Sequence, residues 1–144
     1  MAVESIGRLI KTIERLSDLP RAVAIEAAGP LTAELRKQFD SGTDPYGRPW
    51  APLRPTTLAK GRHEPPLTDT GRLRDGSRAA VAPGGRAGLR LMVGAKYGYF
   101  HQVGFRVGRT TVPPRRILPQ FGLPRAWSLI LRQAARTAAK RAGR

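Results

Sequence analysis

The sequence predicts an α+β fold: N-terminal helices and a C-terminal helix packed on a small, mainly antiparallel β-sheet, with a long arm rich in proline and glycine. Apolar residues recur every three or four positions near both ends of the chain, which is typical of helices. In the segment 89–93, apolar residues at every second position indicate a half-buried strand. The segment 44–60, "DPYGRPWAPLRPTTLAK", contains four prolines and a glycine, which indicates the irregular arm.

With 144 residues the chain is long enough for a modest core, and we expect a single domain. Neither an internal repeat nor a low-complexity tract divides it. The expected parts, in order, are N-terminal helices at 1–39, an extended arm at 40–66, a sheet region at 67–122 and a basic C-terminal helix at 123–144.

The expected helices at the two ends follow from the spacing of their apolar residues. A second helix should begin near Pro20, because proline suits a first helical turn, and should continue to Phe39 with a kink or a break at Gly29-Pro30. The first helix, over residues 3–17, has an apolar face made of Ile6, Leu9, Ile10, Ile13 and Leu16. The last helix has an apolar stripe made of Trp127, Ile130, Leu131, Ala134 and Ala138.

The middle of the chain predicts short elements. A short helical turn is expected near Leu73, with Asp69 or Thr70 as its cap. Strands are expected at 77–82 and 88–94, joined as a hairpin through the turn at 83–87. The aromatic segment "KYGYFHQVGF" fits a short helix or a strand end equally well. The prolines of "TTVPPRRILPQ" should keep that segment irregular.

Positive charge is concentrated in the second half of the chain. The net charge is +16, and all ten acidic residues lie at or before Asp75, so residues 76–144 hold 14 Lys and Arg and no acid. Such a half repels itself unless it meets nucleic acid, acidic surfaces of partner subunits or an anionic membrane. A membrane partner is not expected, because the last helix places mostly alanine opposite its cations. An Arg-rich surface with no partner is the remaining explanation.

Residues suited to catalysis or metal binding do not form a recognisable pattern. There is no cysteine, and no signal peptide or transmembrane segment is predicted. His63 and His101 lie far apart, and neither has a second ligand at metal-site spacing. Asp69 and Asp75 suit turns and caps, and the glycines of "APGGRAG" lack a phosphate-binding spacing. We therefore predict no enzymatic activity, no metal and no cofactor.

Several cations are candidates for contact with DNA or with acidic protein partners. Because the residues at 132, 136 and 140 are four apart, they share one face of the last helix, which could lie along a phosphate backbone. No zinc finger, leucine zipper or RNP-like strand is present, so contact with DNA should be non-specific. The aromatic residues at 97–100 fit a core or an interface better than base stacking. The candidate cations are Arg115, Arg116, Arg132, Arg136 and Lys140.

Several short motifs also follow one another in a characteristic order. After Phe39 come "DPYGRPW", a Thr-x-x-Lys element at 57–60, "LTDTGRL", a hairpin, "YFHQVG" and "VPPRRIL", and then the last helix. This order resembles the phage virion morphogenesis family, which includes tail-completion proteins of tailed phages. The similarity spans roughly residues 31–135. The family's usual Pro-Ala-Arg is Pro113-Pro114-Arg115 here, a departure that would alter the turn.

The resemblance implies a structural protein of the neck or the head-proximal end of the tail, made in the host cytoplasm and present in the virion. Such proteins finish the tail tube and help to join it to the DNA-filled head, as a ring that would be a hexamer by analogy. The implied partners are further copies of the chain, neighbouring neck and tail-tube proteins and, non-specifically, packaged DNA. The alternative is a free-standing, non-specific DNA-binding protein. A terminator, an adaptor and a transient assembly factor remain equally open.

The irregular arm needs anchors, and the predicted ones are Tyr46, Trp50 and Leu53. An aromatic side chain of tryptophan's size can bury about 200 Å² and so hold a loop that has no hydrogen-bond ladder. Trp50 is expected either in the protein's own core or in the contact with a neighbouring subunit. A platform for stacking a ligand is the least favoured reading. The flanking prolines stiffen the arm and lower the entropy lost when it docks.

Overall fold

A computed structural model describes residues 2–83 and 88–144, and it has the expected α+β fold. The helices are α1 (Ala2–Ser17), α2 (Leu19–Ser41), α3 (Pro55–Leu58), α4 (Arg72–Gly76), α5 (Gly98–Val103) and α6 (Arg125–Ala142). The strands are β1 (Arg78–Val81), β2 (Leu89–Met92), β3 (Phe105–Val107) and β4 (Thr110–Val112).

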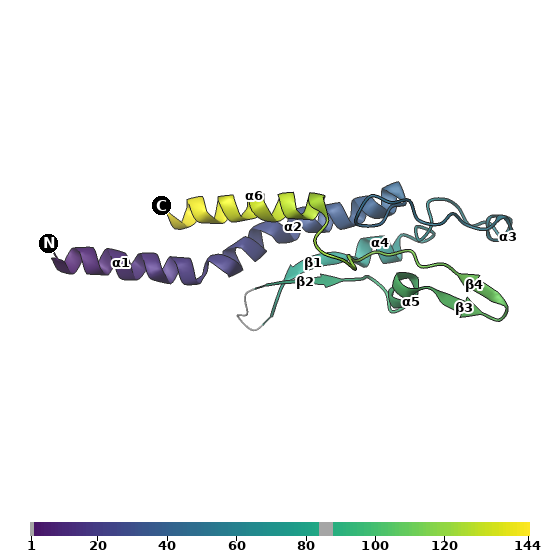
Figure 1. The fold of residues 1–144 in the computed structure, drawn as a ribbon, viewed down its shortest axis with the longest axis horizontal. Helices are drawn as coiled ribbons and strands as arrows, with labels where there is room; N and C mark the ends of the chain where they lie inside the picture. Colours follow the sequence, from purple (N-terminus) through teal and green to yellow (C-terminus); the bar gives the residue numbers. More distant parts are fainter. Residues whose placement is uncertain (1, 84–87) are drawn as a thin grey trace.

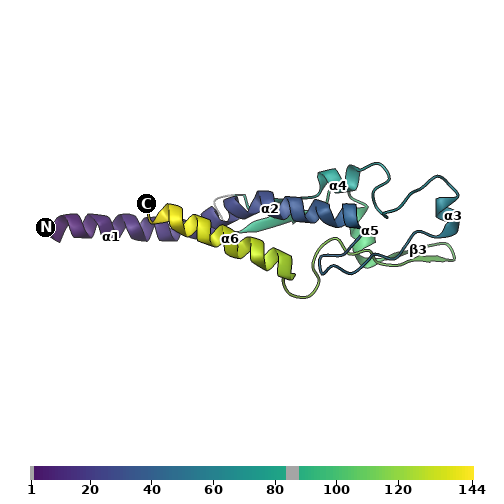
Figure 2. The ribbon, with the colours of Figure 1, turned by 90° about the horizontal axis from the view of Figure 1, so that it is seen from above.

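The molecule is elongated, with α2 and α6 side by side along its length (Figure 1). The hairpin of β1 and β2 covers one side of α2, whereas α1 projects beyond this body at one end (Figures 1 and 2). The arm, α3 and the hairpin of β3 and β4 lie at the opposite end. The two ends of the molecule are therefore built from different elements.

The core lies where α2 meets α6 and β1. The buried face of α2 includes Leu31, Leu35 and Phe39, and Trp127 of α6 packs against it. These positions recur at helical spacing, as the sequence predicts. The remaining buried members are mostly small or come from loops, among them Ala79 of β1. This narrow core leaves α1 and the tip of the second hairpin outside it.

The structure differs from the sequence-based expectation along α2. The helix is continuous from Leu19 to Ser41, although a break was expected at Gly29-Pro30. Pro30 lies on the exposed side of α2. Proline has no N–H to donate to the carbonyl four residues earlier, and water can hydrogen-bond to that carbonyl instead. The helix ends at Gly42, whose φ of 66° is in the left-handed region and whose N–H donates to Gln38 O.

Both sheets are two-stranded and antiparallel. In the first, Arg78 pairs with Met92 and Val81 with Leu89, which is the expected hairpin; residues 84–87 of its turn lie outside the described residues. In the second, between β3 and β4, the strand β4 falls in the segment 110–120 that was expected to be irregular. Its β-branched residues favour a strand up to Pro113, and the prolines come only after the last paired position, so they do not interrupt the ladder.

The short helices also refine the predictions. The segment around Phe100 is the helix α5, which settles a choice that the sequence left open. The cap of α4 is Gly71, with a φ of 72°, in place of the expected Asp69 or Thr70. Thr70 nevertheless contacts the first turn of α4, because its Oγ1 accepts from the Arg72 N–H at 3.4 Å.

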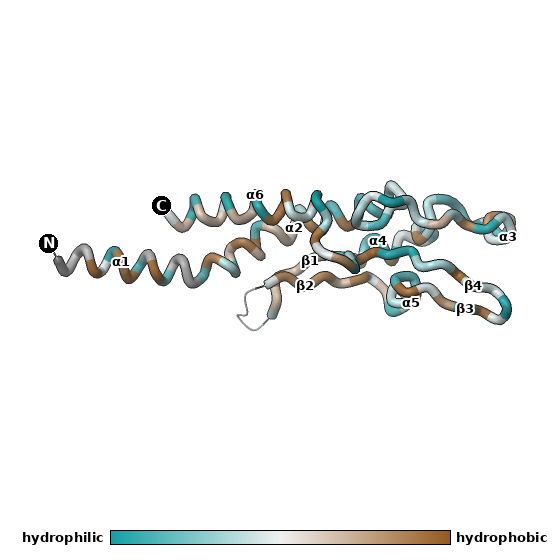
Figure 3. The backbone as a smooth tube through the Cα atoms, viewed as in Figure 1, coloured by the Kyte–Doolittle hydropathy of each residue, from teal (hydrophilic) through white to brown (hydrophobic). Residues whose placement is uncertain are grey.

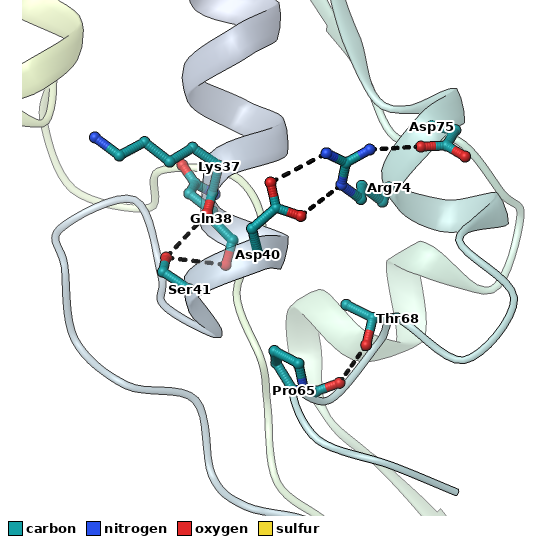
Figure 4. Close-up of polar contacts among 8 residues, drawn as sticks. All are labelled: Lys37, Gln38, Asp40, Ser41, Pro65, Thr68, Arg74 and Asp75. Atoms are coloured by element: carbon teal, nitrogen blue, oxygen red, sulfur yellow. Dashed lines mark hydrogen bonds and ion pairs between the residues drawn. The ribbon is translucent and has the colours of Figure 1, made fainter.

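An ion-pair fork joins α2 to α4 (Figure 4). Arg74 Nε and Nη2 donate to the two carboxylate oxygens of Asp40 at 2.7 and 3.0 Å, and Nη1 donates to Asp75 at 2.8 Å. The hydrogen bonds from Arg74 hold the pKa of Asp40 below its ordinary value. Because the pair is exposed, its contribution to stability is small, and it serves mainly to orient α4.

Candidate assembly surfaces

The arm begins with a tight turn that Asp44 organises. Its Oδ1 accepts from the backbone N–H groups of Tyr46 (2.9 Å) and Arg48 (2.8 Å). The Tyr46 hydroxyl then bonds to the loop before α6, because it donates to Gly122 O at 2.9 Å and accepts from the Phe121 N–H at 2.8 Å. Tyr46 thus ties the arm to the start of α6.

Trp50 lies in the protein's own core. Its side chain is 6% exposed, and its ring meets Phe39 edge-on, with centroids 5.5 Å apart. Nε1 donates to Arg116 O at 2.9 Å, so the polar edge of the ring is also paired. Leu53, the third predicted anchor, is half-buried, and its backbone N–H donates to the Glu64 carboxylate at 2.6 Å. The arm is therefore held by intramolecular contacts.

Arg115 has a different position from the one that the sequence suggests. It is only 6% exposed, so in this molecule it faces the interior instead of DNA or a partner. Its Nε donates to Ala51 O at 2.7 Å and its Nη2 to Pro52 O at 3.0 Å. A guanidinium can hold two carbonyls of an irregular chain at once, because its donors form a rigid fork. Arg116 is half-buried and contributes its backbone carbonyl to Trp50.

Two glutamines that were not predicted as site residues fix the proline-rich segment 113–118. Gln102 Oε1 accepts from the N–H groups of Ile117 (2.8 Å) and Leu118 (2.9 Å), and its Nε2 donates to Leu118 O at 2.9 Å. The buried Gln38 donates from Nε2 to Ile117 O at 3.0 Å. These bonds stand in for a sheet ladder. Of the two, only Gln102 had a sequence signal, as part of "YFHQVG".

The basic face of α6 is open to solvent. Arg132, Arg136 and Lys140 are all exposed, while Ala134 and Ala138 on the other side of the helix are buried. The predicted phase of this helix therefore agrees with the structure. At its C-terminal end Arg141 forms an ion pair with Glu26 of α2.

An apolar stripe on α1 is left uncovered. Its described members, Ile6, Leu9, Ile10 and Ile13, are 50–58% exposed; the side chain of Leu16, the expected fifth member, lies outside the described residues. Apolar stretches recur along the projecting helix in Figure 3. We call these four residues the α1 stripe. A helix with such a face normally packs against another element.

A second apolar surface lies toward the opposite end, on α5 and β3. Its aromatic rings contact one another edge-on: the Phe100 ring lies against Tyr99 and Phe105, at centroid distances of 5.9 and 6.1 Å. Because the rings of Tyr99 and Phe100 are exposed, they are not part of the core, and the remaining uses for them are an interface or base stacking. We call this surface the aromatic patch; its exposed members are Tyr99, Phe100, Val103 and Val107.

Two uncovered apolar surfaces, a basic helix face and a tightly anchored arm are features expected of an assembly subunit. The model of the phage virion morphogenesis family matches residues 2–137. The chain belongs to this family. No curated protein matches the chain, and no solved structure does either. Membership assigns this virion morphogenesis protein a role in building the phage particle.

The described residues hold no membrane-spanning helix and no metal-binding cluster. None of the helices there is long and apolar enough to cross a membrane. Over the same residues, His, Asp and Glu do not gather into a group of three that could hold a metal ion.

Replacing His101 should reduce the loss of stability on mild acidification. Burial and then the charge of Arg115 lower the pKa of His101 from its ordinary 6.5. The unfolded chain therefore takes up this proton at a higher pH than the folded protein, so stability is present above about pH 6.5 and falls as the pH drops below it. One proton limits the slope to about 1.4 kcal/mol per pH unit.

Urea unfolding at about pH 7.5 and about pH 5.5 measures this difference, in a window above the titration of ordinary carboxyl groups. His101→Gln should lose less stability across the window than the parent protein. His63→Gln, at an exposed site, is the matched control and should behave like the parent. Equal losses in the parent and in His101→Gln would contradict the prediction.

Proposed function

We propose that this protein completes the phage tail: several copies form a ring at the neck or at the head-proximal end of the tail and help to join the tail to the DNA-filled head. Family membership supports an assembly role. The observation that carries the proposal toward self-assembly is the exposed α1 stripe. Together with the aromatic patch, it gives each copy two separate apolar surfaces, as a head-to-tail contact requires if it is to close into a ring. Figure 1 shows α1, which carries the first, and α5 and β3, which carry the second, in different parts of the molecule.

The magnitudes indicate that the α1 stripe needs help from a second surface. Full burial of one aliphatic side chain contributes about 1.5–3 kcal/mol, so covering the exposed half of four would contribute roughly 3–6 kcal/mol. Association costs about 4–15 kcal/mol in lost freedom of motion. The stripe alone would therefore give a weak contact. In a closed ring every copy makes two contacts, and the aromatic patch can supply the remaining apolar area.

Light scattering tests the proposal through the mass of the purified protein at low and at high salt. A ring-sized species is expected, favoured by high salt because each subunit carries +16 and salt screens the repulsion. Leu9→Asp/Ile13→Asp should shift the protein to a monomer, since two carboxylates would have to be buried in the contact. Lys11→Asp also adds negative charge, but away from the stripe, and should leave the ring intact.

An unchanged mass in the Leu9→Asp/Ile13→Asp variant would show that the α1 stripe is not the contact. A parent protein that stays monomeric at both salts, and also when purified tail tubes are added, would overturn the ring itself. Circular dichroism of the variants distinguishes either result from unfolding, because the core around α2 and α6 does not include the two substituted positions.

The second candidate function is non-specific DNA binding, which the exposed basic face of α6 favours. Arg132→Glu/Arg136→Glu/Lys140→Glu should fold like the parent but lose contact with DNA or with an acidic partner. Three phosphate contacts would change the slope of log K against log salt by about 3. A DNA titration across a salt series measures this slope.

Arg109→Glu, at an exposed site on the second hairpin, is the control for a change in charge alone. Tight DNA binding by a monomeric parent would favour this second function over the ring. A triple variant that fails to fold would show that the face is internal, contrary to its exposure in the structure.

A further inference from the structure

A cavity of about 450 Å³ lies between the arm, α4 and α5, and neither proposed function uses it. Its volume is within the range of about 300–1,000 Å³ that is usual for ligand pockets. Part of its wall is apolar. Leu53 lies within the arm, Leu67 directly follows the arm, Leu73 belongs to α4, and Tyr97 precedes α5. This wall suits an aliphatic side chain.

The same cavity is lined by Arg115, a buried cation without a carboxylate bonded to it. Two of its nitrogens are used by Ala51 O and Pro52 O, whereas no hydrogen bond from Nη1 is found among the described residues. Burial lowers the pKa of Arg115, and the charge of Glu64 offsets only part of that effect. A buried guanidinium in this state gains from a carboxylate, which returns the stabilisation that water supplied before folding.

His101 lines the cavity beside Arg115. The Arg115 backbone N–H donates to His101 O at 2.7 Å, so the two side chains start from backbone positions that are close in space, and both line the cavity. Nδ1 of His101 is buried and has no hydrogen-bond partner among the described residues. The cavity therefore holds two groups with an unpaired nitrogen, Nη1 of Arg115 and Nδ1 of His101, and a neutral imidazole can place its proton on Nδ1 and donate from it.

The rim of the cavity adds further positive charge. Arg62 and Arg72 both line it. Asp69 is the one acidic residue among the described lining residues, and Arg62 already neutralises it through an ion pair. The charge left over at the cavity is positive, in a protein whose net charge is +16.

We propose that this cavity binds an acidic segment of a partner protein, with an aliphatic side chain against the leucines and a carboxylate on Arg115 and His101. A nucleic-acid phosphate would meet the cations but would leave the leucine wall unused. A segment that carries both groups uses the whole site. Complementary charge would also steer an acidic partner toward this end of the molecule. The proposal holds whether or not the protein forms a ring.

The probe is a pair of blocked peptides, acetyl-Leu-Leu-Glu-amide and acetyl-Leu-Leu-Gln-amide, titrated into the full chain at low salt. Nuclear magnetic resonance follows the signals of His101 and Tyr97. The Glu peptide should shift both signals saturably and should bind at least about tenfold more tightly than the Gln peptide, because charge-assisted hydrogen bonds are about twice as strong as neutral ones. Inorganic phosphate and a 5′-phosphorylated oligonucleotide are the competing probes.

Two variants separate binding from folding. Arg115→Met should abolish the preference for the Glu peptide, but it also removes two bonds to the arm. His101→Phe keeps an aromatic side chain and leaves the bonds of Arg115 to the arm in place. It should weaken binding of the Glu peptide several-fold, while binding of the Gln peptide is unchanged. Arg109→Met, an exposed arginine away from the cavity, should change neither peptide.

Equal affinity for the two peptides would overturn the proposal, because the cavity would then recognise only apolar groups. Absence of a saturable shift with either peptide would overturn it as well. Tighter binding of the oligonucleotide than of the Glu peptide at the same signals would reassign the cavity to a nucleic-acid end. A Glu preference that survives in His101→Phe and in Arg115→Met would place the carboxylate elsewhere.

Discussion

Trp50→Ala is expected to destabilise the protein by about 3–5 kcal/mol and to release the arm from the body. The ring is 6% exposed and packs edge-on against Phe39, itself fully buried on α2. Removing it opens a cavity in a narrow core and leaves Arg116 O without the indole donor at 2.9 Å. Apart from the isolated bridge between Thr43 and Pro49, no strand pairing within the described arm could replace these contacts.

Limited proteolysis of residues 40–66, combined with urea unfolding, measures both effects. Trp50→Phe is the matched control: it keeps an aromatic ring against Phe39 but loses the Nε1 hydrogen bond. Such a bond contributes about 0.5–1.5 kcal/mol, so this variant should lose much less stability than Trp50→Ala. Unchanged protease sensitivity of the arm in Trp50→Ala would show that Tyr46 and Arg115 hold it without the indole ring.

The elements that the sequence predicted well are those whose signal is local. The spacing of apolar residues indicated both long helices of the body and the phase of α6, since each residue on a helix faces the core or the solvent according to its position alone. The same reasoning indicated the strand that contains Leu89 and Leu91. Pro30 shows the limit of such rules: its helix-breaking tendency is overridden because α2 is held on both sides by α6 and β1.

Other attachments of the arm and of segment 113–118, made by Arg115, Gln38 and Gln102, could not be predicted in this way. Arg115 carries a charge, which favours a surface position, and only the approach of Ala51 and Pro52 from a distant part of the chain makes its burial favourable. Gln38 and Gln102 are equally ambiguous, because a glutamine serves as well in water as against a buried carbonyl. The contacts of all three are separated by more than a dozen residues in the chain, so periodicity holds no trace of them.

These long-range contacts also explain how an irregular segment can present surfaces for assembly. Segment 113–118 is hydrogen-bonded to Gln38 of α2, Gln102 of α5 and Trp50 of the arm, so it joins the arm, the core and the cavity wall. A surface built on segments that are fixed at several points loses less entropy when it binds a partner. The projecting α1, with few contacts to the body, is the opposite case, and in the proposed ring a neighbouring subunit would cover it.

Gly94→Ala is the second substitution with a large expected effect, about 3 kcal/mol or more of lost stability. Here the end of α4 and the segment after β2 cross in close contact: a Cβ on Gly94 would lie 2.5 Å from Gly76 Cα and 2.7 Å from Leu73 O. Both are backbone atoms, so no flexible side chain can move aside.

The contact around Gly94 is also bonded through Ser77, whose Oγ donates to Leu73 O at 2.6 Å and accepts from the Gly94 N–H at 3.1 Å. Separating the two backbones by the width of a methyl group would break this buried pair as well. Urea unfolding measures the loss. Gly7→Ala, on α1 with open space around it, is the control and should not lose stability.

The position of Leu73 links this substitution to the proposed binding cavity. Leu73 closes the cavity wall, and its carbonyl is one of the atoms that a methyl group on Gly94 would displace. A Gly94→Ala protein that still folds at low temperature should therefore bind the Glu peptide more weakly, although neither Arg115 nor His101 has been changed. If stability falls but peptide affinity does not, the wall formed by α4 is not part of the binding site, and the aliphatic contact must come from Leu53 and Leu67 alone.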